Sequence, residues 1–234
     1  MLAAEPRIAV PQAVLFDLDG TLVDSVPDLA RCVNAALSSV DQPSVHEHEV
    51  RTWVGNGANR LLHCALTGQL HGVAPLATHS TAMATFNAHY AAEPCRSSRL
   101  YPGALATVIA LAAGGVRLGC VTNKPHRFTL PLLDLLGLGR YFASVVGGDS
   151  TPQLKPDPLP VLTALAQLGT PAGRSLLVGD SRIDMAAGRA AGVATVAIRH
   201  GYDSECDFLD LGAVAVLERL VELPGVWGEP SFAD

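Results

Sequence analysis

The chain has few cysteines, and their spacing excludes two common kinds of structural cross-link. Its 234 residues include five cysteines, an odd number, and no two of them form a C-x-x-C pair. A disulfide framework or a cysteine zinc site needs paired or closely spaced cysteines. We therefore expect free, buried thiols in a reducing compartment. The cysteines are Cys32, Cys64, Cys95, Cys120 and Cys206.

Long apolar runs and basic runs are also missing. The longest apolar stretch, around residues 105–113, is too short to cross a bilayer. Residues 1–11 lack the charged start and the apolar run of a signal peptide. Because the net charge is −6 and no basic run exists, neither nucleic acid nor an anionic membrane surface is an expected partner. We predict a cytoplasmic protein, and both a monomer and a homodimer remain open.

Lysine is almost absent as well. Of the 16 basic residues, only Lys124 and Lys155 are lysine, and the others are arginine. A bias in base composition can produce such a preference without any physical cause. A lysine that is kept under this bias is nevertheless a candidate for a role that arginine does not fill.

The hydrophobic pattern divides the chain into two kinds of segment. A short apolar run at residues 14–16 indicates a buried strand. From residue 26 to about residue 98 the spacing of apolar residues is helical, and no strand pattern interrupts it. We predict a helical cap domain over residues 26–98, inserted into a core domain formed by residues 1–25 and 99–234. The expected cap helices lie at residues 27–37, 57–65 and 78–90.

Strand and helix patterns alternate along the rest of the chain. Repeated strand–helix units imply right-handed crossovers and a parallel sheet with helices on both faces. The predicted fold class is therefore α/β, with a doubly wound, Rossmann-like parallel sheet. Pro131 is expected to kink its helix, and residues 224–234 are expected to form a loosely held tail. The expected strands lie at residues 116–121, 144–147, 175–178 and 194–198, and the expected helices at residues 104–113, 126–136, 159–168, 185–191 and 214–223.

Two carboxylates, Asp17 and Asp19, follow the strand at residues 14–16 directly. In an open α/β sheet, ligands bind at the carboxyl ends of the strands, which is where these acids are expected. The alternative is an ordinary solvated Asp-Gly turn. Two acids at a strand end favour a functional reason, because aspartate is disfavoured in strands and costly to bury.

Polar side chains follow the next two strands of the core. Thr122 and Asn123 offer a hydroxyl and an amide that can hydrogen-bond phosphate oxygens, or they simply begin a turn. Lys155 lies in a proline-rich loop after the strand at residues 144–147. A surface lysine is the alternative there. A compact ammonium can, however, pair both with an aspartate and with a phosphoryl group that is being transferred.

Two further carboxylates, Asp180 and Asp184, lie at the end of the strand at residues 175–178. Their spacing of four residues places them on the same side of the chain. Capping of the next helix by Asp180 or Ser181 is compatible with a role in a site. Together with Asp17 and Asp19, these acids concentrate negative charge that is unfavourable unless a cation neutralises it. Oxygen ligands without a nearby histidine or cysteine favour Mg²⁺ over zinc.

These segments, in this order and spacing, resemble the four sequence motifs of the haloacid dehalogenase (HAD) superfamily of phosphohydrolases. The resemblance begins with DLDGTLVDS at residues 17–25 and covers nearly the whole chain. It implies that Asp17 attacks phosphorus to form an aspartyl-phosphate, and that Asp19 acts as general acid and then as general base. Lys155 would neutralise charge on Asp17 and on the phosphate.

The resemblance also implies the groups that bind metal and phosphate. Mg²⁺ would be held by the carboxylates of Asp17 and Asp180 and by the backbone carbonyl of Asp19. Thr122 and Asn123 would hold the phosphoryl group. The residues expected behind these groups are Asp184, which would orient Lys155 or a metal-bound water, together with Ser181 and Thr21.

The cap carries the segment TWVGNGA at residues 52–58. It reads either as a glycine-rich turn anchored by Trp53 or as a helix start whose N–H groups meet a small anion. The segment is similar to a cap motif of bacterial phosphoglycolate phosphatases. That resemblance implies hydrolysis of 2-phosphoglycolate, with Gly55, Asn56 and Gly57 over the substrate.

Other functions remain open at this point. Asp19 argues against a true dehalogenase, and the absence of lysine from residues 26–98 excludes a Schiff-base mechanism in the cap. A phosphatase of another small phosphorylated metabolite, a phosphosugar mutase and a non-enzymatic phosphate-binding regulator are the alternatives. Arg51 and Arg60 are candidates for binding the substrate carboxylate, and each could equally be a solvated charge on a helix.

Overall fold

A six-stranded parallel sheet forms the centre of the core. The structure is a computed structural model that describes residues 8–203 and 205–228. The strands run in the order β5-β4-β1-β6-β7-β8, and every neighbouring pair is parallel. The predicted α/β fold class is therefore confirmed. The strands are β1 (Ala13–Phe16), β4 (Arg117–Val121), β5 (Ser144–Val146), β6 (Ser175–Gly179), β7 (Ala194–Ile198) and β8 (Ala215–Leu217).

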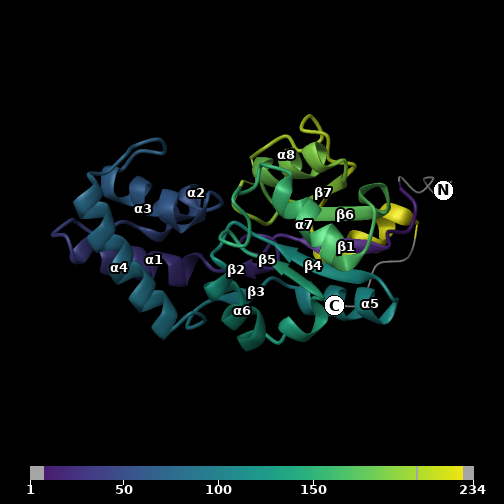
Figure 1. Ribbon diagram of the computed structural model, residues 1–234, viewed down its shortest axis with the longest axis horizontal. Coiled ribbons are helices and arrows are strands. Elements are labelled where there is room, and N and C mark those ends of the chain that lie inside the picture. Colours follow the sequence, from purple (N-terminus) through teal and green to yellow (C-terminus); the bar gives the residue numbers. More distant parts are fainter. Residues whose placement is uncertain (1–7, 204, 229–234) are drawn as a thin grey trace.

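Helices cover both faces of the sheet (Figure 1). The four residues of β1 are fully buried, and their side chains alternate between two hydrophobic clusters. Ala13 and Leu15 pack with side chains of α7 (Leu159–Leu168) and α8 (Arg182–Ala191). Val14 and Phe16 pack on the other face with α5 (Ala104–Ala113) and α6 (His126–Leu135). A strand with period-2 side chains must be apolar throughout when both of its faces are covered, as β1 is.

A second group of helices forms the cap, on the left in Figure 1. The helices predicted at residues 27–37, 57–65 and 78–90 are confirmed, and they share a hydrophobic cluster of their own. Phe128 of α6 belongs to that cluster, so the cap packs against the core through α6. The division of the chain into domains at residues 25 and 99 stays a prediction. The cap helices are α1 (Val26–Ser38), α2 (Glu47–Trp53), α3 (Gly57–Thr67) and α4 (Leu76–Ala92).

Helix α2 was not predicted. Its seven residues are too short to show a helical period, and its beginning is stabilised locally. The Glu49 carboxylate accepts a hydrogen bond of 2.9 Å from the His46 backbone N–H. This contact satisfies one of the N–H groups that a helix start leaves unpaired.

The chain leaves and re-enters the core through two short paired strands, β2 (Val23–Asp24) and β3 (Arg99–Leu100). Next to this pair, the buried Asp28 carboxylate in the first turn of α1 binds the returning chain. One of its oxygens accepts hydrogen bonds of 2.9 and 2.7 Å from the N–H groups of Ser97 and Ser98, and a third of 2.7 Å from the Ser98 hydroxyl. Burial alone raises the pKa of Asp28, but these hydrogen bonds outweigh it and hold the pKa below its usual value.

Replacing Asp28 by alanine is expected to lower the free energy of unfolding by about 2–3 kcal/mol at neutral pH, because two buried donors of Ser98 and the N–H of Ser97 lose their acceptor. An acid whose pKa is lowered on folding stabilises the protein fully above its unfolded pKa, near 4, and loses that contribution below it. The difference between wild type and Asp28→Ala in urea unfolding should therefore shrink as the pH falls below about 4.

The control for this experiment is Asp134→Ala, which removes an exposed carboxylate of α6. It should change the free energy of unfolding by less than about 0.5 kcal/mol. A difference for Asp28→Ala that does not vary with pH would contradict the role of its ionised carboxylate.

Two sequence predictions at the end of the core are wrong. Residues 214–223 form no continuous helix, because Ala215–Leu217 add β8 to the sheet beside β7 and Leu220–Trp227 form a 3₁₀ helix, η3. The sheet edge pairs these apolar residues with β7 in a partly buried position, which outweighs their helical spacing. Residues 224–228 are also not a loose tail, since Pro224, Val226 and Trp227 are buried. Residues 229–234 lie outside the described part.

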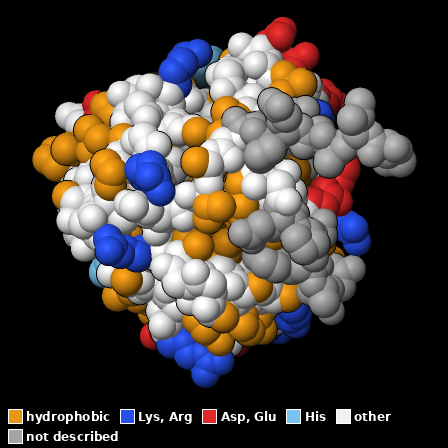
Figure 2. Space-filling view, turned by 90° about the vertical axis from the view of Figure 1, so that its right-hand side faces the viewer, with side chains coloured by type: hydrophobic (Ala, Val, Ile, Leu, Met, Phe, Trp, Pro, Cys, Tyr) orange, Lys and Arg blue, Asp and Glu red, His pale blue; other side chains and the backbone are white. Residues whose placement is uncertain are grey.

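The end of the core remote from the cap presents side chains of several kinds among the residues that the structure describes (Figure 2). In the space-filling view of this end, hydrophobic and basic side chains are interspersed (Figure 2). Within the described residues, every helix is too short or too polar to span a bilayer. The polar residues expected in a site lie at the opposite end of the core, next to the cap.

Candidate active site

The site is built at the carboxyl ends of three neighbouring strands. β4, β1 and β6 are adjacent in the sheet, so the residues that follow them meet at one edge. Asp17 follows β1, Thr122 follows β4 and Asp180 follows β6, and all three are buried. The convergence expected from the sequence is therefore present in the structure.

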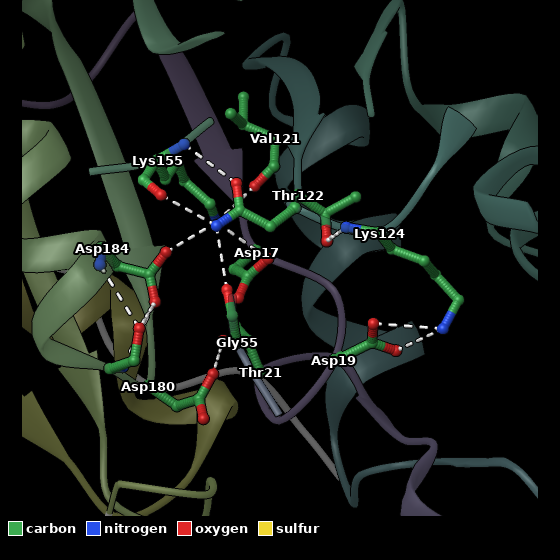
Figure 3. A network of polar contacts seen from close by, with 12 residues as sticks. Asp17, Asp19, Thr21, Gly55, Val121, Thr122, Lys124, Lys155, Asp180 and Asp184 are labelled. Carbon is green, nitrogen blue, oxygen red and sulfur yellow. Dashed lines mark hydrogen bonds and ion pairs between the residues drawn. The ribbon is translucent and has the colours of Figure 1, made fainter. Parts of the chain in front are cut away.

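Lys155 lies at the centre of this arrangement (Figure 3). Its ammonium nitrogen is 2.9 Å from Asp17 Oδ1, 2.7 Å from Asp184 Oδ1 and 2.7 Å from the Val121 carbonyl oxygen. Burial alone lowers the pKa of Lys155, but the two carboxylates outweigh it and hold the pKa above its usual value. Lys155 is thus a fixed positive charge between two of the acids.

Asp184 contacts both Lys155 and the helix cap of α8. Its Oδ1 atom binds Lys155, while its Oδ2 atom accepts a hydrogen bond of 2.6 Å from the Ser181 hydroxyl. Ser181 is the N-cap of α8, and its hydroxyl in turn accepts from the Asp184 backbone N–H. The helix cap therefore also orients the carboxylate that holds Lys155.

Asp180 is held by the loops on either side of it. Its Oδ1 accepts a hydrogen bond of 2.7 Å from the Thr21 hydroxyl, and its Oδ2 accepts one of 2.8 Å from the Tyr202 backbone N–H. Gly20 lies directly against it with φ +91°, and a Cβ there would collide with the carboxylate. The Tyr202 contact was not predicted, because the loop after β7 carries no motif that the sequence analysis recognised.

The acids form a cluster that could bind a metal. Oxygen atoms of Asp17, Asp180 and Asp184 lie within 4.8 Å of one another. Burial raises the pKa of Asp17 to about 6, although Lys155 counteracts it. Burial, followed by the charges of Asp17 and Asp184, raises the pKa of Asp180. A set of buried, mutually repelling oxygen donors is the environment in which a hard divalent cation is stabilising.

Asp19 is oriented away from this cluster and is bound by a second lysine. Both of its carboxylate oxygens are 3.1 Å from Lys124 Nζ, and Oδ1 also accepts a hydrogen bond of 2.5 Å from the Ser25 hydroxyl. Figure 3 shows this pair on the other side of Asp17 from Lys155 and Asp184. Neither partner of Asp19 was predicted. For Lys124 a signal existed, because it is one of two lysines and directly follows the Thr-Asn pair.

The side-chain amide of Asn123 contacts backbone groups of the cap loop and of the Lys155 loop. Its amide nitrogen donates hydrogen bonds of 2.9 Å to the carbonyl oxygens of Gly55 and Lys155. Its amide oxygen accepts a hydrogen bond of 2.9 Å from the Lys155 backbone N–H. The side-chain amide is therefore engaged with backbone of the cap and of the Lys155 loop. The adjacent Thr122 hydroxyl is buried and accepts from the Lys124 N–H at 3.2 Å.

The cap loop reaches the site between α2 and α3. Gly55 and Gly57 adopt φ values of +118° and +78°, which favour glycine, and Gly55 contacts Asn123 as described. Asn56 is exposed at the N-cap position of α3. The structure thus places this loop at the boundary between cap and core.

Arg51 and Arg60, the candidates for binding a substrate carboxylate, are both engaged within the protein. Arg51 is 3.3 Å from the Asp24 carboxylate and lies over the Tyr202 ring, 5.0 Å from its centre. Arg60 donates to the carbonyl oxygens of Leu70 and Gly72 at 3.1 and 2.6 Å. These contacts support a structural role for each guanidinium.

A cleft and a smaller cavity meet at Asp17 and Asp19. The outer cleft has a volume of about 480 Å³ and is lined by both domains, including Asn56 and Asp180. The inner cavity is much smaller, about 40 Å³, and extends beneath α4 of the cap, with Lys124 in its wall. A ligand that reaches Asp17 is therefore in contact with both core and cap.

Known proteins are similar to this chain over most of its length. The family model of haloacid dehalogenase-like hydrolases matches residues 14–198. A protein of Pseudomonas aeruginosa named phosphoglycolate phosphatase 1 is 42% identical over 227 residues, which cover 95% of this chain and 83% of that protein. A phosphoglycolate phosphatase of Nitrosococcus oceani is 40% identical over 213 residues, with 91% and 95% covered.

Solved structures agree with this result. The crystal structure of a predicted phosphoglycolate phosphatase from Haemophilus somnus superimposes with a TM-score of 0.85 at 33% identity and covers 94% of this chain and 98% of its own. The match of family, sequence and structure extends through all four strand-end segments described above. The chain belongs to the haloacid dehalogenase-like hydrolase family.

Proposed function

We propose that this protein is a phosphatase that hydrolyses 2-phosphoglycolate to glycolate and inorganic phosphate, with Mg²⁺ as cofactor and Asp17 as nucleophile. The observation that carries the proposal is the pairing of buried Asp17 with Lys155, next to Asp19 and beneath the cap loop at Gly55. The names of the relatives support the substrate, because they share about two fifths of the residues over nearly the whole chain.

In the first step, an oxygen of Asp17 forms a bond to phosphorus while the bond between phosphorus and the glycolate oxygen breaks. Asp19 gives its proton to the departing oxygen, so that glycolate leaves as an alcohol. In the second step, Asp19 takes a proton from water, and the water oxygen displaces Asp17 from phosphorus. Lys155 keeps the Asp17 oxygen in place and balances the charge of the phosphoryl group.

The residues present fit Mg²⁺. The carboxylates of Asp17 and Asp180 and the backbone carbonyl of Asp19 would hold it, whereas the Asp184 oxygens are already bound to Lys155 and Ser181. When bound, the ion would lower the repulsion between these acids and a phosphate dianion. The Thr122 hydroxyl would donate a hydrogen bond to a phosphoryl oxygen. Asn123 would act chiefly by holding together the loops around the phosphoryl group.

The proposal is tested by measuring phosphate release from 2-phosphoglycolate beside phosphosugars, nucleotides and an aryl phosphate, with Mg²⁺ and with EDTA. We expect metal-dependent hydrolysis with the highest kcat/KM for 2-phosphoglycolate. Metal-dependent hydrolysis that favours another phosphoester would contradict the substrate and keep the chemistry. Isomerisation of a phosphosugar with little phosphate released would instead identify a mutase.

Mg²⁺ is expected to stabilise the protein more at about pH 8 than at about pH 5. Because burial raises the pKa of Asp17 to about 6 and also raises that of Asp180, the metal-free protein loses free energy of unfolding as the pH rises from about 4 to about 6. Above that pH range, a bound cation would neutralise the carboxylates of Asp17 and Asp180 in place of the protons. At a free concentration of a hundred times its Kd, Mg²⁺ should contribute about 2.7 kcal/mol.

The measurement is thermal unfolding with Mg²⁺ and with EDTA at the two pH values. The Asp180→Asn variant is the control, because it should lose most of the Mg²⁺-dependent shift at the higher pH. Equal shifts at both pH values would show that the cation does not compete with protons at Asp17 and Asp180.

A further inference from the structure

The inner cavity has a polar end and an otherwise apolar wall. Leu29, Leu61 and Phe86 of the cap and Phe128 of α6 line it, and Asp19 and Lys124 lie at its boundary with the catalytic site. Its volume is about 40 Å³, and one water molecule takes roughly 10–15 Å³ of such a space. It therefore accommodates about three water-sized groups, which is close to the CH₂ and carboxylate of a glycolate unit.

Lys124 is placed to bind an anion in this cavity. Its ammonium carries three N–H donors, and two of them are directed at the oxygens of Asp19. The nitrogen is also 4.6 Å from the centre of the Tyr90 ring, and the Lys124 side chain is only 4% exposed. An ammonium so deeply buried interacts strongly with any anion that enters, because little water screens it.

Tyr90 supplies a second, independent observation. It projects from α4, is fully buried and lines the same cavity. Its hydroxyl oxygen lies beside the Lys124 ammonium, which can donate to it, but the hydroxyl proton itself has no acceptor among the described residues. A buried hydroxyl proton without an acceptor is costly, and a carboxylate oxygen in the cavity would accept it.

The position relative to Asp19 fits 2-phosphoglycolate. In this substrate the carboxylate carbon is two bonds from the oxygen that Asp19 protonates. A group that binds the carboxylate must therefore lie beside Asp19, as Lys124 does at 3.1 Å. Arg51 and Arg60 are bound elsewhere, through the Asp24 carboxylate and through the carbonyl oxygens of Leu70 and Gly72.

We propose that the Lys124 ammonium and the Tyr90 hydroxyl bind the carboxylate of the substrate in the inner cavity, and so select a phosphoester with a short, anionic tail. The proposal rests on the proposed function, since it names the groups that recognise 2-phosphoglycolate. Because Lys124 comes from the core and Tyr90 from the cap, this recognition requires the two to be packed together. A larger sugar tail does not fit the cavity.

The test compares two substrates that differ only in the group of interest. Ethyl phosphate has the same P–O–CH₂ linkage as 2-phosphoglycolate, with a methyl group in place of the carboxylate. The measured quantity is the ratio of kcat/KM for 2-phosphoglycolate to that for ethyl phosphate. Loss of Asp19 positioning would lower both values and leave the ratio unchanged, so the ratio separates recognition from catalysis.

Lys124→Met is expected to lower this ratio by about tenfold to a hundredfold, because a hydrogen-bonded charge pair with the carboxylate is lost. Tyr90→Phe, which removes only the hydroxyl, should lower it by about threefold to tenfold. The matched control is Arg60→Met, which removes a cation from the outer cleft and should leave the ratio as in wild type. If Lys124→Met does not fold, as judged by circular dichroism, Tyr90→Phe decides the test.

The outcomes separate the two proposals. A wild-type preference for 2-phosphoglycolate that Lys124→Met retains would overturn the carboxylate subsite and keep the proposed function. An equal fall of the ratio in Arg60→Met would also overturn the subsite. Wild-type protein that prefers another phosphoester and does not favour 2-phosphoglycolate over ethyl phosphate would overturn the proposed function and the subsite with it.

Discussion

Replacing Asp17 by asparagine is expected to lower kcat on 2-phosphoglycolate by about 10⁴-fold or more, because the amide cannot form the phosphoenzyme. The residue lies at the end of the central strand, buried and paired with Lys155 at 2.9 Å, so no neighbouring carboxylate can take its place without moving. Asp180 is bound by Thr21 and Tyr202, and Asp184 by Lys155 and Ser181. The measurement is phosphate release under saturating substrate and Mg²⁺.

This loss should occur without unfolding. Asparagine has nearly the shape of aspartate, and Lys155 keeps its partner Asp184. The thermal unfolding curve and the circular dichroism spectrum of Asp17→Asn should therefore remain those of a folded protein. The control is Asp134→Asn on the exposed face of α6, which should retain wild-type kcat. Asp17→Asn protein with more than about 1% of wild-type kcat would identify a different nucleophile.

Replacing Lys155 by methionine is expected to affect both stability and catalysis. The ammonium is the partner of Asp17 and Asp184, and its side chain is 2% exposed. Removal of one member of a buried ionic cluster leaves uncompensated charge, which costs about 3–5 kcal/mol of the free energy of unfolding. Loss of one fixed positive group near the transition state should also lower kcat by about 10²- to 10³-fold.

A double variant separates these two effects. In Lys155→Met/Asp184→Asn the carboxylate that lost its partner is neutral, so part of the free energy of unfolding should return while kcat stays low. Urea unfolding without metal and phosphate release with Mg²⁺ measure the two quantities. If Asp184→Asn restored activity to Lys155→Met, the positive charge at Lys155 would not be what the reaction requires.

The sequence alone determined the α/β class and the positions of most strands. Fully apolar runs of about three residues between helical patterns have few other solutions than buried parallel strands, and residues 14–16 and 176–178 show this most clearly. The parallel topology then placed Asp17, Thr122 and Asp180 at one edge, because the carboxyl ends of adjacent strands coincide. The resemblance to a known family supplied the expected roles of these residues.

Other features depended on packing that local patterns do not express. Residues 214–223 have a helical spacing, yet β7 offers Ala215–Leu217 a place in the sheet, so pairing across the chain overrides local preference. The hydrogen bonds of the Asn123 amide join Gly55 to Lys155, residues that are 100 positions apart in the sequence. Contacts of this kind have no signature in a single segment.

The two lysines differ in how far a local sequence pattern predicts their contacts. Lys155 has a motif context that indicates contact with acids of the strand ends, whereas Lys124 follows a Thr-Asn pair that also begins ordinary turns. Lys124 pairs with Asp19 across the adjacent strand ends of β1 and β4, and it faces Tyr90 only because the cap helix α4 packs over it. The sequence thus determined the chemistry at the strand ends, since strand order fixes which residues meet there. The tertiary structure determined the cavity for the rest of the substrate, because its walls come from distant segments that meet only in the folded protein.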